Sequence, residues 1–388
     1  MWIDQGKISS FLQSLFEYQI KSESRGKMEC DEMNNFIKVW LSALVSLSYC
    51  YVMSKIISKG PKRLIFFLPI MCLFIFLPLK LNYINLVGAT GFFLSWLANF
   101  KLLLLAFNKG PLASNPPISF GRFIVIASFP IEIRENNTTI NQNKQNPFQK
   151  NLKPTINFTV KTLLLAILIR VCDDKDQINP NVLLVLYSFA VYLILETILV
   201  IVATLVRVMA GLELEPQFNE PFLSTSLQDF WGRRWNLMVT RILRPTVFEP
   251  TLRFSSTLLG LNYKWAALPA VMATFVVSGL VHELIYFYMA RTSPTWEVTS
   301  FFVLHGLCLT VEIVLKRALS DRWRLPRLVS GALTIGFVML TSFWLFFPQL
   351  LRCKADVRTL QEYINLGKLL GKMVSQSYHF LTKFHSQQ

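Results

Sequence analysis

The residues best suited to chemistry lie in one polar segment, 226–244, and in a single histidine that follows it. The segment reads SLQDFWGRRWNLMVTRILR and sets Asp229, Asn236 and four arginines among bulky aromatic side chains. Such groups are costly between long apolar runs unless water, lipid headgroups or a ligand meets them. Downstream, His282 lies in the apolar stretch VVSGLVHELIYFY, beside Glu283. We therefore expect the chemistry at these two places.

A histidine in a dry apolar span suits general-base catalysis. The reference pKa of imidazole is about 6.5, so the neutral ring can take a proton from an alcohol that attacks a carbonyl. Excluding water favours transfer to an alcohol over hydrolysis of an activated acyl group. The alternative is a hydrogen bond between packed helices, and His305 in FFVLHGLCLTVE has the same ambiguity. Spacing alone does not rank the two histidines.

The polar segment also has two interpretations. Tryptophan and arginine commonly anchor a helix at the membrane surface, and the aromatic and apolar residues from Trp231 to Met238 fall roughly on one helical side. Anchoring does not need Asn236, whose amide suits orienting a reacting carbonyl or the histidine. Guanidinium forks, in turn, match phosphate oxygens. The candidate substrate-binding residues are Trp231, Arg233, Arg234, Trp235, Arg241 and Arg244.

Several other chemistries lack their motifs. The chain contains no GxSxG elbow, no HxxxD, no HExxH zinc motif and no glycine-rich phosphate loop. Its six cysteines are scattered without a CxxC pair, which favours neither a disulfide framework nor a zinc cluster. The acidic run DDKD at 173–176 is typical of a solvated loop, although such a cluster also suits a metal. We expect no metal site and no bound cofactor.

Composition indicates that membrane-spanning helices position these residues. The 388 residues are 53% hydrophobic and 16% charged, against about 25% charged in globular domains. Since a helix needs about 20 apolar residues to cross a bilayer, we predict an all-α integral membrane protein with about eight transmembrane helices plus interfacial helices. The predicted spans are 36–57, 64–79, 83–107, 155–171, 181–206, 265–290, 297–315 and 328–351.

The net charge of +16 supports an orientation. Basic loops fall on alternate connections, as the positive-inside rule expects, which places 226–244 in the cytosol and 291–296 in the lumen. The Asn-X-Thr sequons at 136, 137 and 157 would then stay unglycosylated. Because no basic domain stands apart from the spans, we expect the positive charge to meet membrane lipid and not nucleic acid.

We divide the chain into three parts. These are a polar N-terminal extension at 1–33, a multi-span domain at 34–351 with its motif region at 215–290, and an amphipathic tail at 352–388. The first part has neither a long apolar run nor a cleavage pattern, so we do not expect it to act as a secretory signal. The tail suits either the membrane surface or packing against the protein.

The motif region resembles a known family. DFWGRRWN, followed by the His-Glu pair at 282 and 283 in an apolar span, is similar to the signature of the membrane-bound O-acyltransferase (MBOAT) superfamily. The flanking EPQFNEPFLSTSLQDFWGRRWN, RPTVFEP and SGLVHELIYFY resemble its plant wax synthase branch. The resemblance runs roughly from 33 to 350.

This resemblance implies an MBOAT-like bundle in the endoplasmic reticulum membrane, with a tunnel for the acyl chain. It implies acyl-CoA as co-substrate and a long-chain alcohol as acceptor, giving a wax ester and CoA. It assigns His282 as the catalytic base and Asn236 as a second catalytic residue, and it offers no counterpart for His305, which we therefore interpret as a packing residue. The same branch includes sterol acyltransferases and diacylglycerol acetyltransferases, so the acceptor stays open.

A non-catalytic lipid transporter is the further alternative. It predicts charged residues that face each other across spans, whereas Arg170, Glu196 and Glu312 have no evident partner in the sequence. Acyl transfer instead requires Asn236 and His282 to lie close together. Asn236 is predicted on the cytosolic side, whereas His282 lies roughly 25 Å along its helix from about residue 266, at about 1.5 Å per residue. For both to serve one site, the 215–262 region must enter the bundle.

Overall fold

The described part of the chain is helical. The computed structural model describes residues 5–114, 118–130, 147–173, 178–211, 215–319, 325–355, 358, 359 and 362, without the side chains of 5–30, 147–157, 173, 209 and 210. These residues contain no strand, which confirms the predicted all-α class. The sequons at 136 and 137, the side chains of Asn157 and Asp173, the rest of the DDKD run at 174–176 and most of the predicted tail lie outside this description.

Seven helical stretches of the described chain are long and apolar enough to cross a membrane. They are Asp31–Ile56, Pro61–Lys80, Ile84–Ala106, Pro180–Val208, Tyr263–Ala290, Glu297–Ala318 and Arg327–Arg352. Each coincides with a predicted span. The remaining prediction, 155–171, falls in helix α6 (Pro147–Asp173), whose described side chains begin at Phe158.

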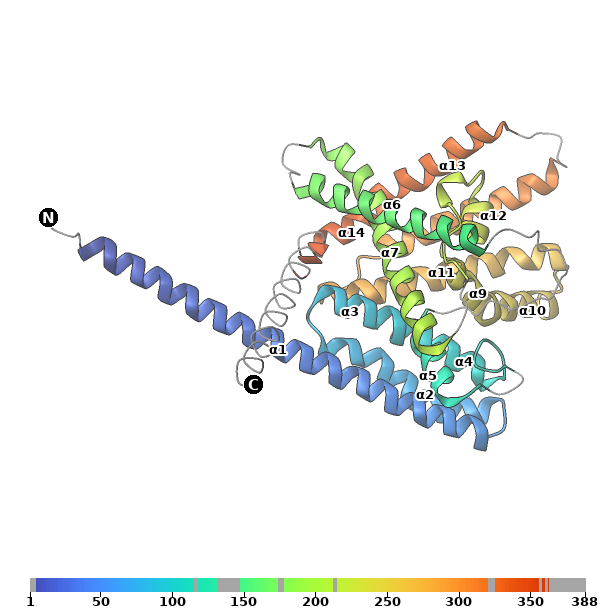
Figure 1. Cartoon of the computed structure of the whole chain (residues 1–388). Helices are drawn as coiled ribbons and strands as arrows, with labels where there is room; N and C mark the ends of the chain where they lie inside the picture. The colour runs from blue at the N-terminus through green and yellow to red at the C-terminus, as the bar shows by residue number, and fades with distance from the viewer. Residues whose placement is uncertain are drawn as a thin grey trace.

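These spans are built from helices with local breaks. The first half consists of α1 (Gln5–Ile56), α2 (Pro61–Phe76), η1 (Leu77–Lys80), α3 (Ile84–Thr90), η2 (Gly91–Ala98), α4 (Asn99–Ala106), α5 (Phe120–Ser128), α6 and α7 (Pro180–Ala210). The last spans are α11 (Tyr263–Ala290), α12 (Glu297–Ala318), and α13 (Arg327–Thr341) continued by η7 (Ser342–Phe346) and α14 (Phe347–Arg352). Helix α1 crosses the predicted boundary at residue 33 without a break, and its first part extends away from the bundle (Figure 1).

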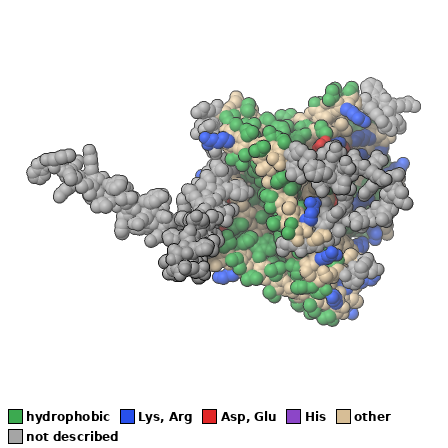
Figure 2. Space-filling model, in the orientation of Figure 1, with side chains coloured by type: hydrophobic (Ala, Val, Ile, Leu, Met, Phe, Trp, Pro, Cys, Tyr) green, Lys and Arg blue, Asp and Glu red, His purple; other side chains and the backbone are tan. Residues whose placement is uncertain are grey.

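The bundle places α11 between two groups of helices. In Figure 1, α1, α2 and α4 lie together below α11, while α12 and α13 lie above it and α7 crosses in front. Helix α11 packs against α12 over much of its length and also meets α3. Figure 2 shows hydrophobic side chains over much of the visible surface, as expected for a face in contact with lipid.

The chain between α7 and α11 is folded in short pieces. It comprises η4 (Pro221–Leu223), α8 (Leu227–Asp229), η5 (Phe230–Arg234), α9 (Leu237–Leu243), η6 (Arg244–Phe248) and α10 (Glu249–Thr257). Of these, α8 packs on α12, and η6 and α10 pack on α11. The polar segment 226–244 therefore lies against the two helices that carry His282 and His305.

Two glycines let α11 and α12 approach closely. A Cβ added at Gly279 would lie 2.9 Å from the Thr299 Cα, and one added at Gly306 would lie 2.9 Å from the Phe275 Cβ. Small residues are used in this way where membrane helices cross. One turn beyond Gly279, the buried Glu283 carboxylate accepts the backbone N–H of Thr299 at 3.2 Å. Glu283 thus caps the start of α12.

Two acidic residues for which the sequence showed no evident partner, Glu196 and Glu312, do have partners in the structure. The expectation that they lack partners was therefore wrong. Glu196 on α7 pairs with Lys161 on α6, with 2.6 Å between Oε1 and Nζ. Glu312 on α12 pairs with Lys316 at 2.8 Å and accepts the backbone N–H of Leu227 at 2.8 Å. Arg170 also interacts with other groups. Lys316 lies one turn from Glu312 on the same helix, at a spacing that the sequence shows. Lys161 and Leu227 lie on other elements than their acidic partners, which sequence spacing does not show.

The α11–α12 crossing predicts the effect of one added methyl group. Gly279→Ala should lower the stability by about 1–3 kcal/mol, because the new Cβ meets backbone and not a movable side-chain tip. Gly336→Ala on α13 is the matched control, since nothing lies within 4 Å of its added Cβ. Thermal unfolding in detergent micelles should show a lower midpoint for Gly279→Ala alone. Equal midpoints for the two variants would contradict a tight crossing.

Candidate active site

The polar segment 226–244 is not one surface helix. After α8 and η5 the backbone turns at Trp235, and Asn236 takes the left-handed conformation (φ 41°, ψ 66°) before α9 begins. This turn is held from outside, because the Gln217 backbone carbonyl accepts the Leu237 N–H at 2.8 Å and the Gln217 side chain accepts the Met238 N–H at 3.1 Å. The break turns the segment away from the regular path that a single anchoring helix would follow.

Trp231 shows how far the segment enters the bundle. Its ring lies 5.6 Å from Phe275 on α11, and 5.9 Å from Phe302 and 6.4 Å from Phe301 on α12, measured between centroids. The side chain is thus packed between the two helices. Part of the 215–262 region thus enters the bundle, as the sequence led us to expect.

Asn236 combines two unusual features. A positive φ at a non-glycine residue costs about 1–3 kcal/mol and persists only where the surroundings impose it. In addition, its side-chain Oδ1 is enclosed and has no hydrogen-bond partner among the described residues. Buried polar atoms are normally paired, so such an atom calls for an explanation such as a ligand or water. The side chain also makes no capping bond to α9.

Among the described residues, one ring nitrogen of His282 has no hydrogen-bond partner. Its Nδ1 lies 2.7 Å from the backbone carbonyl oxygen of Ser278, one turn earlier on α11. A carbonyl only accepts, so Nδ1 carries the proton and donates it. In the neutral ring, Nε2 then holds the lone pair that a general base needs. The side chain is half-buried, and the neighbouring Glu283 is committed to α12.

Aromatic rings surround the His282 imidazole. Phe302 lies 4.5 Å away between centroids, Phe346 on η7 lies 6.0 Å away and Trp96 on η2 lies 6.4 Å away. Trp96 also belongs to a buried cluster that contains Met238 and Val281. Met238, two residues after Asn236, and Val281, directly before His282, therefore pack in the same cluster, which brings the two predicted catalytic segments together.

His305 is fully buried and joins three elements. Its Nδ1 accepts the indole N–H of Trp231 at 3.1 Å, and its Nε2 lies 2.8 Å from the Thr341 hydroxyl on α13. That hydroxyl donates to the Phe337 carbonyl at 2.7 Å. Sequence reasoning did not find the bond to Trp231, because the two residues are far apart in the chain.

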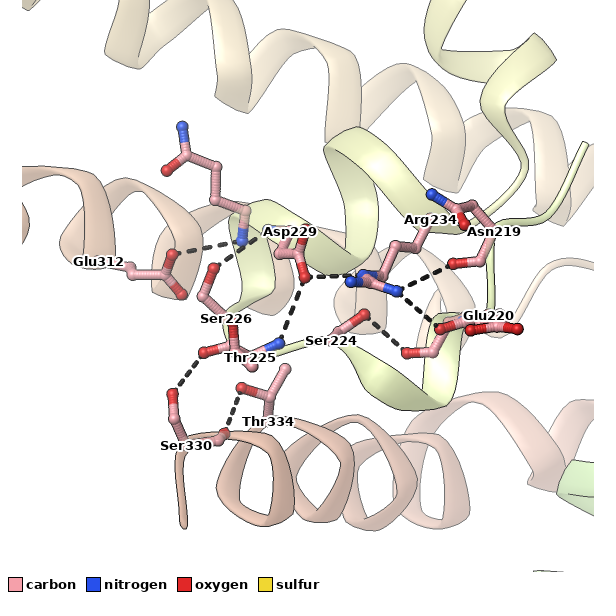
Figure 3. A network of polar contacts seen from close by, with 12 residues as sticks. Asn219, Glu220, Ser224, Thr225, Ser226, Asp229, Arg234, Glu312, Ser330 and Thr334 are labelled. Atoms are coloured by element: carbon pink, nitrogen blue, oxygen red, sulfur yellow. Dashed lines mark hydrogen bonds and ion pairs between the residues drawn. The ribbon is translucent and has the colours of Figure 1, made fainter. Parts of the chain in front are cut away.

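Arg234 holds the segment together (Figure 3). Its Nε donates to the Asp229 carboxylate at 2.8 Å, and its Nη1 donates to the backbone carbonyls of Asn219 and Glu220, both at 3.2 Å. Asp229 lies in the first turn of α8, where the Ser226 hydroxyl accepts its backbone N–H at 3.1 Å. Although Arg234 was predicted to bind substrate, its Nε and Nη1 are already engaged by groups of the fold.

The other predicted binding residues divide into two groups. Trp235 is packed, stacking on Phe230 with centroids 5.4 Å apart and meeting Phe218 at 5.2 Å. The exposed group consists of Arg233, Arg241 and Arg244. Arg244 lies 3.8 Å from Glu249, a loose pair in which the arginine side chain is 70% exposed, and Arg241 also interacts with other groups. These exposed guanidiniums suit an anion that arrives from solvent.

Comparison with known proteins adds a second line of support. A model of the membrane bound O-acyl transferase family matches residues 214–304. An acyl-CoA–sterol O-acyltransferase of Arabidopsis thaliana is 44% identical over 336 residues, covering 86% of this chain and 96% of the relative. A long-chain-alcohol O-fatty-acyltransferase of Simmondsia chinensis is 45% identical over 333 residues, covering 86% and 94%. The chain belongs to the membrane bound O-acyl transferase family.

Family membership confirms the resemblance drawn from the motif region. A probable long-chain-alcohol O-fatty-acyltransferase of Arabidopsis thaliana is also similar, at 46% identity over 321 residues (82% of this chain, 90% of the relative). The region that matches the family model contains both Asn236 and His282, and it ends at residue 304, directly before His305. The protein is thus a multi-pass membrane member of an acyltransferase family.

The contacts of Arg234 predict that two neighbouring arginines behave differently. Arg234→Met should lower the stability by about 1–3 kcal/mol, because it leaves Asp229 and two carbonyls without their donor. Arg233→Met is the matched control and should leave the unfolding midpoint unchanged, since that side chain is exposed. Thermal unfolding in detergent measures both. A larger loss for Arg233→Met would refute the structural role of Arg234.

Proposed function

We propose that this protein transfers the acyl group of acyl-CoA to a long-chain alcohol, forming a wax ester and free CoA, with His282 as the general base. The observation that carries the proposal is the state of the His282 ring. Its Nδ1 proton is held by the Ser278 carbonyl, which leaves Nε2 as an acceptor within a half-buried aromatic surround. Membership of an acyltransferase family supplies the reaction class.

The chemistry follows from that lone pair. As the alcohol oxygen attacks the thioester carbonyl, the His282 Nε2 takes the hydroxyl proton, and a C–O bond forms. The carbon–sulfur bond then breaks, and the imidazolium returns the proton to the CoA sulfur. The carbonyl oxygen gains negative charge during the attack, so an amide donor from Asn236 directed at it would lower the barrier. Atoms and charge balance without a further reactant.

Exclusion of water makes this chemistry selective. An activated acyl group next to a general base would be hydrolysed if water reached it. The rings of Phe302, Phe346 and Trp96 around His282 provide an apolar surround in which a long-chain alcohol competes well with water. The same surround suits the alkyl chains of both substrates.

Acyl-CoA would approach from the side that carries the exposed arginines. Arg233, Arg241 and Arg244 offer guanidinium groups to its phosphates. We assign a different role to Trp231, Arg234 and Trp235. Their packing and hydrogen bonds hold the segment in the fold that places Asn236 inside the bundle. We place this enzyme in the endoplasmic reticulum membrane, as the family resemblance implies, and we place its arginine-bearing side in the cytosol on the basis of the alternating basic loops.

A sterol is the second candidate acceptor, for one specific reason. The Arabidopsis relative named as a sterol acyltransferase is 44% identical to this chain, against 45% for the Simmondsia relative named for long-chain alcohols. Identity therefore does not separate the two acceptors. We favour the alcohol because several further relatives carry that name. The transporter alternative lacks comparable support in a chain of this family.

One experiment tests both the reaction and the acceptor. The protein is expressed in yeast without storage-lipid acyltransferases, the cells are fed fatty alcohols or sterols, and neutral lipids are resolved. Wax esters should form, and His282→Ala should reduce them at least about 100-fold at equal protein level, since it removes the base. His379→Ala, in the polar tail, is the histidine control and should retain activity. Sterol esters without wax esters would reassign the acceptor, and an active His282→Ala would reject the mechanism.

A further inference from the structure

A part-buried hydrogen bond joins the Trp231 indole on η5 to the fully buried His305 on α12. We propose that His305 is a positioning residue for acyl transfer, which fixes the Trp231 ring and through it the surround of His282. The inference rests on the proposed function and deepens it. It concerns a histidine that directly follows the family-matched region and that sequence reasoning treats as ordinary packing.

The hydrogen bonds define the state of the His305 ring. An indole N–H only donates, so Nδ1 must accept from Trp231. The Thr341 hydroxyl proton goes to the Phe337 carbonyl, so Nε2 must carry the proton that meets the Thr341 oxygen. The ring is therefore a neutral Nε2–H tautomer with both nitrogens engaged. A protonated ring could not accept from Trp231, and the other tautomer would set two N–H groups against each other.

The geometry leads from His305 to His282 in two steps. The Trp231 and His305 rings are nearly perpendicular, at 88°, with centroids 5.5 Å apart, so the indole N–H points at the imidazole edge. Trp231 then packs on Phe302 at 5.9 Å, and Phe302 covers the His282 ring at 4.5 Å. His305 thus sets the position of the side chain that supports the ring over the proposed base.

His282 needs this support because its own hydrogen bonding is sparse. Within the described residues, the Ser278 carbonyl is its one hydrogen-bond partner. That bond holds Nδ1, while the direction of Nε2 also depends on the rings packed around it. A displacement of about 1 Å at a reacting group can cost roughly 100-fold in rate. We therefore assign to His305 an effect on the chemical step and none on acyl-CoA binding.

Two substitutions separate the bonds of His305. Asparagine places an amide acceptor close to the position of Nδ1 and preserves the bond to Trp231, whereas glutamine places its amide nearer Nε2 and loses that bond. His305→Gln should lower kcat about 10- to 100-fold with an unchanged KM for acyl-CoA. His305→Asn should stay within about threefold of wild type, and so should Thr341→Val, which removes only the partner of Nε2.

The double variant and the unfolding midpoint test the route through Trp231. Trp231→Phe removes the same N–H, so Trp231→Phe/His305→Gln should be no slower than Trp231→Phe alone. Unfolding midpoints are measured for all variants, and kcat is measured well below them. A purely structural role would lower kcat and the midpoint in step, for Thr341→Val as well as for His305→Gln.

The outcomes distinguish this inference from the proposed function. Wild-type protein that forms no ester would overturn both. Active wild type, with His305→Gln equal to it, would overturn the inference alone. So would equal losses in His305→Asn and His305→Gln, or a double variant whose losses multiply. A drop in kcat confined to the variants that lose the Trp231 bond would support it.

Discussion

The site depends on a broken, polar stretch of backbone being satisfied inside an apolar bundle. Irregular backbone is tolerated at membrane depth only where protein or a water-filled cavity covers it and its polar groups are paired. Arg234 and Asp229 provide much of that pairing from within the segment, and Glu312 on α12 supplies an acceptor for the first turn of α8. Trp231 then enters between α11 and α12 because its one polar atom meets His305.

A second constraint fixes the other half of the site. Gly279 and Gly306 bring α11 and α12 into close contact, and Glu283 caps the first turn of α12. The carboxylate beside His282 is therefore used to join two helices and not to orient the imidazole. This arrangement leaves His282 with a backbone carbonyl as its partner, which selects the tautomer whose Nε2 is a base.

Much of this could be predicted from the sequence, because hydrophobic spans and family motifs are local signals. Apolar runs gave the all-α membrane class, and the DFWGRRWN motif with His282 gave the family. The roles of individual polar residues were not accessible in this way. Arg234 looked like a phosphate ligand, yet its partners are Asp229 and two carbonyls from the preceding loop. His305 looked like packing because Trp231 is its neighbour only in the folded chain.

One local signal was available and was missed. Ser226 and Asp229 form an S-x-x-D pattern, which is typical of a helix N-cap, and the structure places Ser226 as the cap of α8. A helix that starts there gives Asp229 a structural task and makes an ion pair with a nearby arginine a reasonable expectation. The break at Asn236 could not be foreseen, since a positive φ at asparagine depends on contacts from the residue 217 region.

In the proposed function, Asn236 and the Nε2 of His282 act on one thioester inside the bundle. An experimental structure of the protein in lipid nanodiscs with a non-hydrolysable thioether analogue of acyl-CoA tests it most directly. We expect the analogue's reacting carbon next to the His282 Nε2, its phosphates near the exposed arginines, and the Trp231–His305 bond intact. A reacting carbon held away from His282, or a His282 ring that faces lipid, would contradict it.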